Sequence, residues 1–448
     1  MIAWHVYPLG FAGLPIRPGL RPTPDAAHGP RLDPRQDSRP GSGPTPGGRP
    51  VPGMEPVPEA SRTPSPQPDS APSAFAHLTD WLDYAAALGF EALSLGPVFE
   101  SQTHGYDTLD HYRIDRRLGS EADFLAFLGE AHARGLKVYL DGVFNHLGDR
   151  HRLHLAASTP GPEQAAAERF FRWDGQRPQV FEGHSSLVTL NHEDSAVVTF
   201  VQDVMAHWLG LGVDGWRLDA AYATGPDFWA SVLPGLRERF PEAFFFGELL
   251  HGDGTDFVAR SDLDSVTQYE LWKALWSSIK DCNFFELDWC LKRHNQLLAT
   301  YSPITFIGNH DVTRIASQVG SRGAAIALVA LMSLGGTPHV YYGDEQGFTG
   351  VKEDRAGGDD AVRPPFPAHP SDLAPWGWWL HDLHRRLIEW RRQNPWLARA
   401  TTERLELSNA RMVYRTSGGG QSVTATLDLT DPANPTARLH APDLELAL

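Results

Sequence analysis

The chain has 448 residues, 41% of them hydrophobic, which is enough for one large domain with a sizeable core. Its formal charge of −16, from 39 basic and 55 acidic residues, argues against nucleic acid or an anionic membrane as a partner. The first residues lack a signal-peptide pattern, and no uninterrupted apolar run is long enough for a membrane span. We therefore expect a cytoplasmic protein, whose oligomeric state the sequence does not indicate.

One segment differs in composition from the rest. Residues 17–73 are crowded with proline, glycine, serine and arginine and contain few aromatic or β-branched side chains. Such a segment buries too little apolar surface to offset the loss of chain entropy on folding. We expect a disordered insertion there, following a first barrel strand within residues 1–16.

Past residue 73, strand-like and helix-like segments alternate. The apolar patterns predict strands at 2–9, 92–98, 138–144, 215–218, 244–247, 267–269, 304–307 and 339–342. They predict helices at 78–88, 124–134, 197–211, 228–240, 323–334 and 376–390. This alternation indicates an α/β fold, a (β/α)8 TIM barrel completed by residues 74–398. A doubly wound open sheet is the alternative, because periodicity does not show whether a sheet closes.

Two stretches depart from the even spacing. About 50 residues separate the third strand from the next helix, which is too many for a connecting loop, so we expect a small subdomain at about 147–190. From 399 to 448 the pattern becomes β-like, which predicts a short C-terminal β-module.

Polar side chains cluster just after the predicted strands. They are Asp141, Asn145, His146, Arg217, Asp219, Glu248, Asn309, His310 and Asp311. In a barrel, the C-terminal ends of the strands converge on one pocket. Arg217 and Asp219 are two residues apart on a strand and so share a face. A lone aspartate at a strand end is commonly a helix cap or turn residue, but four polar strand ends in order favour an active site.

These residue types favour glycoside cleavage, which needs one ionised carboxylate and one protonated carboxyl. Arg217 would keep Asp219 ionised, whereas the three phenylalanines before Glu248 would favour its protonated form. The sequence contains no glycine-rich phosphate loop at a strand–helix turn and no Cys/His group with zinc spacing. A barrel aldolase would need a lysine at a strand end, and none stands at the ends named above.

With these residues the sequence resembles the α-amylase family, glycoside hydrolase family 13, over nearly the whole chain outside residues 17–73. Four segments resemble its conserved motifs in order: Asp-Gly-Val-Phe-Asn-His at 141–146, Gly-Trp-Arg-Leu-Asp at 215–219, Phe-Gly-Glu at 246–248 and Phe-Ile-Gly-Asn-His-Asp at 306–311. His-Gly-Tyr-Asp at 104–107 resembles the loop after the family's second strand, and 187–191 resembles a motif near the end of its domain B.

The resemblance implies a retaining mechanism with Asp219 as nucleophile, Glu248 as acid/base and Asp311 as transition-state stabiliser. It also implies sugar contacts from six residues: Tyr106 as a stacking platform, Asp107, His146, Arg217, His310 and, by a looser match, Arg363. No cofactor is implied as required. Asn145 matches a residue that binds calcium in some members, so calcium is the one metal that the resemblance raises, with Asp149 as a further candidate ligand.

One departure from the family bears on the substrate. Many members follow the nucleophile with a Lys-His pair that binds the acceptor side, whereas this chain has Ala-Ala-Tyr-Ala at 220–223. We therefore expect hydrolysis of α-1,4 or α-1,6 glucosidic bonds in small α-gluco-oligosaccharides or dextrins. An α-glucosyltransferase (transglycosylase) with the same catalytic residues is the alternative. The intact Asp219, Glu248 and Asp311 disfavour a carbohydrate-binding protein without activity.

Overall fold

The computed structural model describes residues 1–17, 73–355 and 357–448. The insertion predicted for 17–73 therefore lies, apart from its two end residues, outside the described residues.

Eight parallel strands form a single sheet in the described part of the chain, and their order in the sheet follows the sequence. They are β1 (Ala3–Val6), β2 (Ala92–Leu95), β5 (Lys137–Gly142), β10 (Gly215–Leu218), β11 (Phe244–Gly247), β12 (Ser265–Val266), β13 (Ile304–Thr305) and β14 (Thr337–Tyr341). A parallel bridge between Thr267 and Ile304 joins the two remaining edges, and the N–H of Gln268 donates to the Ile304 carbonyl at 2.9 Å. The sheet is thus closed, which confirms the predicted barrel and excludes the open sheet.

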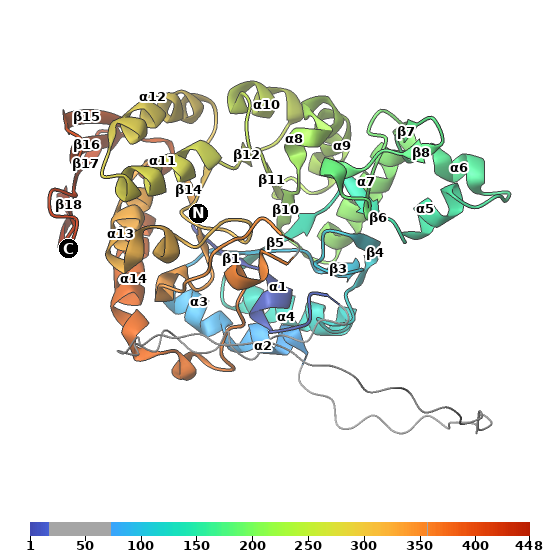
Figure 1. Cartoon of the computed structure of the whole chain (residues 1–448), viewed down its shortest axis with the longest axis horizontal. Coiled ribbons are helices and arrows are strands. Elements are labelled where there is room, and N and C mark those ends of the chain that lie inside the picture. The colour runs from blue at the N-terminus through green and yellow to red at the C-terminus, as the bar shows by residue number, and fades with distance from the viewer. Residues whose placement is uncertain (18–72, 356) are drawn as a thin grey trace, which may run out of the picture.

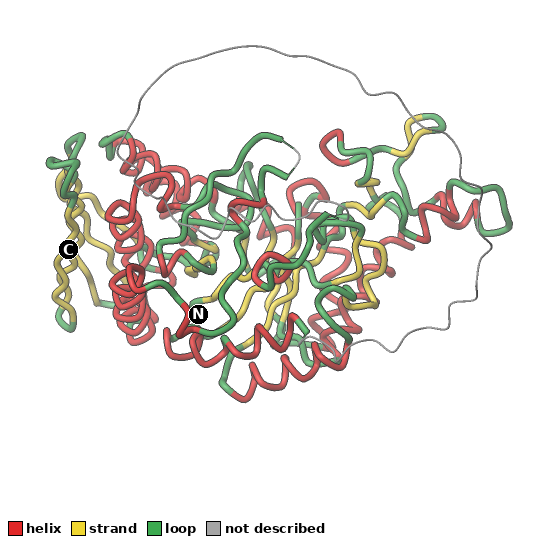
Figure 2. Tube along the Cα trace, turned by 60° about the horizontal axis from the view of Figure 1, so that its bottom comes forward, coloured by secondary structure: helices red, strands yellow, loops and turns green. Residues whose placement is uncertain are grey.

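Helices cover the outside of this barrel (Figure 2). They are α2 (Ala74–Asp80), α3 (Leu82–Leu88), α4 (Glu121–Ala133), α7 (Ser195–Gly210), α9 (Pro226–Arg239), α10 (Gly254–Ser261), α11 (Tyr269–Lys280), α12 (Phe285–Thr300), α13 (Ile315–Ser333) and α14 (Trp378–Gln393). The one-turn helices α1 (Pro8–Phe11) and α8 (Ala221–Thr224) lie just after the C-terminal ends of β1 and β10. By length and composition α13 alone among the described helices could cross a membrane, but 67% of its apolar window is buried inside the molecule, as expected of a core helix.

The alternation of side chains along the strands gives the barrel two apolar regions. One face packs against the helices in the main hydrophobic core, with Trp4 and Trp216 fully buried. The opposite face fills the barrel interior with a separate cluster of Ala3, Ala92, Tyr139, Phe246 and Ile304. Small side chains from β1 and β2 leave room for the aromatic rings of β5 and β11, so the barrel is a packed core rather than a pore. The space above this floor is left to polar residues.

The structure differs from several of the predicted elements; for example, the helix predicted at 323–334 begins at Ile315. The sixth strand is Ser265–Val266, two residues before the predicted 267–269. The predicted helix at 78–88 is two helices, α2 and α3, which meet at Trp81. Helices α10, α11 and α12 follow β11 and β12 without having been predicted.

A small subdomain, which we call domain B, occupies the predicted stretch between β5 and α7. It contains β6 (His146–Gly148), α5 (Arg152–Ala157), α6 (Gln164–Glu168), β7 (Trp173–Asp174), β8 (Arg177–Pro178), η2 (Phe181–Gly183) and β9 (Leu187–Thr189). β6 and β9 pair antiparallel at its base. A hairpin of β3 (Phe99–Ser101) and β4 (Thr108–Ile114) carries the loop after β2.

The chain ends in an antiparallel five-stranded sheet, as predicted for the C-terminal module. Its strands are β15 (Thr401–Leu407), β16 (Arg411–Gly418), β17 (Gln421–Asp428), β18 (Thr436–Ala441) and β19 (Leu444–Ala447). The module and domain B lie at opposite ends of the molecule, with the barrel between them (Figure 1). Short 3-10 helices, η3 (Asp344–Gln346), η4 (Asp360–Val362), η5 (Pro370–Asp372), η6 (Pro375–Gly377) and η7 (Pro395–Arg399), link β14, α14 and the module.

Candidate active site

Arg217 is the centre of the polar cluster at the strand ends. Its Nη1 donates to both carboxylate oxygens of Asp141 at 2.7 Å and to Oδ1 of Asp219 at 3.0 Å. Its Nη2 lies 2.9 Å from Oε1 of Glu248. These residues belong to β5, β10 and the end of β11, which are neighbours in the barrel. One buried guanidinium therefore holds three carboxyl groups together.

The carboxyl of Glu248 receives further hydrogen bonds. Oε2 accepts the N–H of Ala220 at 3.1 Å, and Oε1 accepts the hydroxyl of Tyr269 at 3.0 Å. Ala220 has a positive φ of 46°, a strained conformation for alanine that is typical of functional sites. The apolar surroundings predicted for Glu248 are wrong, because the ring of Phe246 lies in the barrel floor while the carboxyl meets polar donors. The Glu248 carboxyl is thus surrounded by hydrogen-bond donors.

Asp311 lies in the loop between β13 and α13 and is held from two sides. Its Oδ2 lies 2.9 Å from Nε2 of His310, and its Oδ1 accepts Nη2 of Arg363 at 3.0 Å. Nε of Arg363 also donates to the His310 carbonyl at 2.9 Å, and its guanidinium stacks 4.5 Å above the Tyr7 ring. Arg363, which the resemblance predicts as a sugar contact, is buried and fixes Asp311. The Asp311 side chain is 32% exposed and faces the open side of the site.

The electrostatic environments of Asp219 and Asp311 differ. Burial raises the pKa of Asp219 well above its ordinary range; Arg217 opposes this, while Glu248 and Asp141 reinforce it. Arg217 favours the ionised form of Asp219, as predicted, but three carboxyls share this one guanidinium. For Asp311, burial is outweighed by His310 and Arg363, which bring its pKa well below the ordinary range. Asp219 and Asp311 therefore differ in the pH range over which each carboxyl is ionised.

Tyr106 and His146 form one wall of the cluster. The Tyr106 ring is parallel to that of His310, with centroids 5.5 Å apart, and its hydroxyl donates to Oδ2 of Asp141 at 3.0 Å and also contacts Nε2 of His310. Nε2 of His146 lies 3.0 Å from the Tyr106 carbonyl, and its ring stacks on Phe181 of domain B at 4.9 Å. Burial lowers the pKa of His146 to about 4, so its imidazole is neutral.

Asp107 differs from its predicted role. Its carboxylate accepts the backbone N–H of Thr103 at 2.9 Å and the Thr103 hydroxyl at 2.5 Å, and the residue is 1% exposed. The side chain therefore holds the loop between β3 and β4, which positions Tyr106, rather than facing a sugar.

Asn145 and Asp149 are the two residues that the sequence raises as calcium ligands. The Asn145 amide is buried against Nδ1 of His146 at 3.1 Å, and Asp149 has one buried oxygen without a hydrogen-bond partner. Calcium takes six to eight oxygen ligands. Among residues 1–17, 73–355 and 357–448, no group of three or more His, Cys, Asp or Glu side chains is arranged to hold a metal ion.

Sequence reasoning missed several members of the site. Asp141 was placed at a strand end but not recognised as the buried partner of Arg217. Tyr269 begins α11, three residues after β12, at a position where the sequence predicts the sixth strand. His5 on β1 and Tyr7 just after it both contact the cluster, and their spacing of two residues is the available signal.

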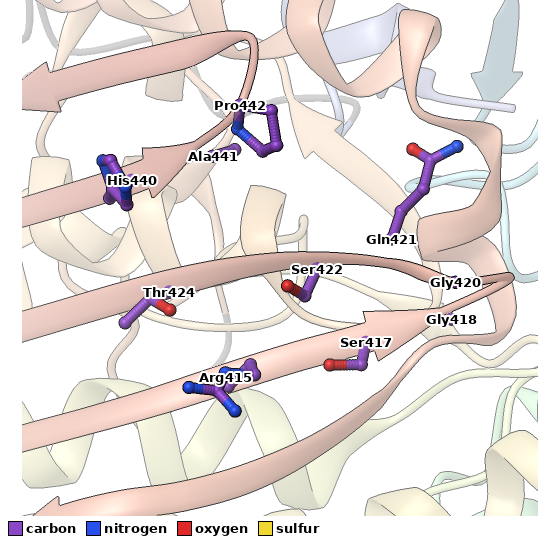
Figure 3. Close-up of a pocket in the computed structure, with 10 residues that line it drawn as sticks. All are labelled: Arg415, Ser417, Gly418, Gly420, Gln421, Ser422, Thr424, His440, Ala441 and Pro442. Atoms are coloured by element: carbon purple, nitrogen blue, oxygen red, sulfur yellow. The ribbon is translucent and has the colours of Figure 1, made fainter.

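A separate hollow of about 730 Å³ lies on the C-terminal module (Figure 3). It is lined by Arg415, Ser417, Gly418, Gly420, Gln421, Ser422, Thr424, His440, Ala441 and Pro442. None of these residues carries a carboxylate or a phenyl, phenol or indole ring. The hollow therefore lacks both the acid–base groups and the stacking surface found at the strand ends.

The fold and the polar cluster around Arg217 define a barrel enzyme whose active site lies at the C-terminal ends of the strands. The chain belongs to the α-amylase family, since the family's catalytic domain, described as "Alpha amylase, catalytic domain", matches residues 74–394.

Individual relatives agree with this assignment. The chain is 30% identical over 290 residues to neopullulanase 2 of Thermoactinomyces vulgaris and 28% identical over 296 residues to the cyclomaltodextrinase of Geobacillus thermopakistaniensis. Each match covers 61% of this chain and 49% of the relative, so the chain matches about half the length of these relatives.

Solved structures show the same fold. The type III pullulan hydrolase of Thermococcus kodakarensis is 25% identical with a TM-score of 0.68, covering 78% of this chain and 64% of its own. The cyclic alpha-maltosyl-(1→6)-maltose hydrolase of Arthrobacter globiformis is 24% identical with a TM-score of 0.71, covering 83% of this chain and 88% of its own.

Proposed function

We propose that the protein is a retaining glycosidase that hydrolyses α-glucosidic bonds in small α-gluco-oligosaccharides or dextrins. The observation that carries this proposal is that Arg217 binds the carboxyls of Asp219 and Glu248 through its two terminal nitrogens. A retaining enzyme needs two carboxyls side by side, about 5–5.5 Å apart, and a shared guanidinium supports that separation.

In this mechanism Asp219 attacks the anomeric carbon while Glu248, protonated in the complex with substrate, gives its proton to the departing glycosidic oxygen. Glu248 then takes a proton from water, whose oxygen attacks the same carbon and releases Asp219. Asp311, ionised because of His310 and Arg363, stabilises the positive charge that develops on the sugar ring. Tyr106 offers a ring face on which the sugar can stack.

The choice of small substrates is supported by the acceptor side of the site. Tyr222, which follows Asp219 on α8, donates its hydroxyl to Glu182 of domain B at 2.8 Å. The Tyr222 ring lies 6.4 Å from that of Phe181 and 5.5 Å from that of His251. These rings wall the cleft next to the catalytic carboxyls, and the wall leaves less room for a long glucan than an open groove would.

The same wall favours the second candidate function, transfer of the glucosyl group to a sugar acceptor. Aromatic rings stack on sugars and exclude water, so an acceptor held between Phe181 and Tyr222 would compete with water for the covalent intermediate. Both functions use Asp219, Glu248 and Asp311 in the same roles.

The test is to incubate the purified protein with maltotriose, isomaltose, trehalose, sucrose and soluble starch and to separate the products by chromatography. We expect release of glucose or maltose from maltotriose, and a kcat/KM per reducing end higher for maltotriose than for starch. Products longer than the substrate would identify transfer. An absence of products from all five substrates, with Asp219→Ala as the blank, would refute the proposal.

A further inference from the structure

A small cavity lies inside the barrel between the catalytic residues and the apolar floor. Its volume is about 30 Å³, and it is bounded by Glu248, Arg217 and His310 on one side and by Phe246 and Ile304 on the other. A cavity needs roughly 10–15 Å³ of such space to hold one water molecule. This one has room for about two.

The side chains that line the cavity are largely polar. In most barrels, branched apolar side chains fill this part of the interior. His5 of β1, Ser94 of β2 and His339 of β14 all point into it and are buried. Nε2 of His339 has no hydrogen-bond partner among the described residues. A buried polar nitrogen is costly unless it is bonded, and water in a polar cavity is the usual partner.

His5 also contacts the catalytic cluster. Its Nε2 lies 3.0 Å from Nδ1 of His310, and the ring centroids are 5.1 Å apart. Two ring nitrogens at this distance form a hydrogen bond only if one carries a proton and the other does not.

The contacts of the other ring nitrogen of His310, Nε2, decide which of the two histidines donates the proton. Nε2 of His310 faces Asp311 at 2.9 Å and the oxygen of Tyr106, whose own proton goes to Asp141. An ionised carboxylate only accepts, so Nε2 of His310 carries a proton. In a neutral His310, Nδ1 is then bare and accepts from Nε2–H of His5. Nδ1 of the neutral His5 is in turn bare and needs a donor. Burial, together with His310, Arg217 and His339, lowers the pKa of His5 well below its ordinary value, which keeps it neutral.

We propose that the cavity is a binding site for ordered water and that His5 is a positioning residue. Water donates to Nδ1 of His5, whose Nε2–H donates to Nδ1 of His310 and fixes His310 in the tautomer that presents its Nε2–H to Asp311. The water bridges to Nε2 of His339 as well. The consequence for catalysis rests on the proposed role of Asp311, whereas the tautomer and the water do not depend on it.

The tautomer is tested by nitrogen-15 NMR of protein labelled only at histidine, recorded near pH 8, where free imidazole is neutral. His310→Gln assigns the signals. We expect a protonated Nε2 and a bare Nδ1 for His310. In His5→Phe, which keeps a ring but removes the donor, the Nδ1 signal should shift or the two tautomers should mix. In His5→Gln, whose amide can donate, the wild-type pattern should return. A protonated Nδ1 in the wild type, or an unchanged His310 in His5→Phe, would overturn the proposal.

Kinetics and a crystal structure complete the test. We expect His5→Phe to lower kcat about tenfold, as for the loss of one buried hydrogen bond, with KM nearly unchanged, and His5→Gln to restore most of it. The matched control is His384→Phe, which removes a buried histidine bonded to the Leu380 carbonyl on α14 and should leave kcat unchanged. Equal kcat losses in His5→Phe and His384→Phe would overturn the positioning role.

A high-resolution crystal structure should show water within hydrogen-bond distance of Nδ1 of His5 and Nε2 of His339, and a dry cavity would overturn the water site. If the wild type cleaves none of the sugars, the proposed function fails, while the NMR result still decides the tautomer.

Discussion

The hydroxyl of Tyr222 donates to Oε1 of Glu182 at 2.8 Å and so connects the segment after Asp219 to the tip of domain B. Glu182 adopts a positive φ of 49°, which is unusual for a residue with a side chain. The contact thus holds a strained turn of domain B over the acceptor side of the site.

Removing this contact should weaken substrate binding more than it affects the fold. We expect Tyr222→Phe to raise the KM for maltotriose about three- to tenfold, because the wall formed with Phe181 loses its anchor. The thermal midpoint should change little, since Glu182 is exposed. Tyr112→Phe, on β4 and away from the carboxyls, is the control. Equal KM values in the two variants would show that the wall does not bind the sugar.

The proposed roles of Asp219 and Glu248 predict the stereochemistry of the product. Proton NMR of the first product should show the α-anomer, which mutarotates only later. Asp219→Ala should lower kcat by several orders of magnitude with the fold intact by circular dichroism. Glu248→Gln should impair oligosaccharides far more than activated aryl glycosides, because only poor leaving groups need a proton donor. An initial β-anomer would contradict both roles.

Asp141 should be required for stability as well as for activity. Both of its oxygens accept from Arg217, and it is fully buried, so Asp141→Asn disrupts a buried ion pair. We expect the free energy of unfolding in urea to fall by about 3 kcal/mol and kcat to fall with it. Asp115→Asn disrupts another buried pair, with Arg117, and should lower stability while leaving kcat unchanged. A stable and fully active Asp141→Asn would contradict the central place given to Arg217.

Glu345 should make the protein less stable as the pH rises. Burial raises its pKa to about 7, from an ordinary value of 4.5. Between these two pH values the folded state therefore holds a proton that the unfolded chain releases. The contribution of Glu345 to the free energy of unfolding is complete below about pH 4.5 and is lost as the pH passes about 7. Asp344, whose pKa burial raises to about 6, acts in the same direction.

Glu345→Gln imitates the protonated side chain and should remove this loss. We compare the difference in free energy of unfolding between Glu345→Gln and the wild type at two pH values. This difference should be about 2–3 kcal/mol larger at pH 8 than at pH 5, in favour of the variant. Urea denaturation at both values measures it, and Glu389→Gln on the surface of α14 is the control. A difference independent of pH would mean that Glu345 is ionised in both states.

The parts of the fold that the sequence predicted best are those with the most uniform burial. β10 and β11 begin and end at the predicted residues, because all four positions of β10 are buried and a glycine bounds each strand. β12 has only two residues, too few for any periodicity, and its closing contact at Thr267 is a single bridge.

The residues of the site likewise divide into those that the sequence could place and those that it could not. Asp219 and Glu248 could be placed near the strand ends because each directly follows a strand, and Asp311 because it lies in the loop after β13. The inward side chains of Asp107 and Arg363 could not be assigned, because their partners Thr103 and Asp311 are set by loop conformation. The surroundings predicted for Glu248 are wrong because Phe244 and Phe246 face the floor of the barrel and Phe245 faces the main core, so none of them describes the surroundings of the carboxyl.

Because the barrel closes between its first and last strands, it cannot be completed until nearly the whole chain has been synthesised. β1 pairs with β14, where Ala3 lies opposite His339, so the first barrel strand is a neighbour of the last. On the ribosome, β1 can pair with β2 early, but its other edge stays unpaired until residues 337–341 have emerged. Contacts between residues so distant in sequence form slowly, and exposed edges favour aggregation meanwhile. The nascent chain is therefore expected to depend on chaperones until the last barrel strand has been made.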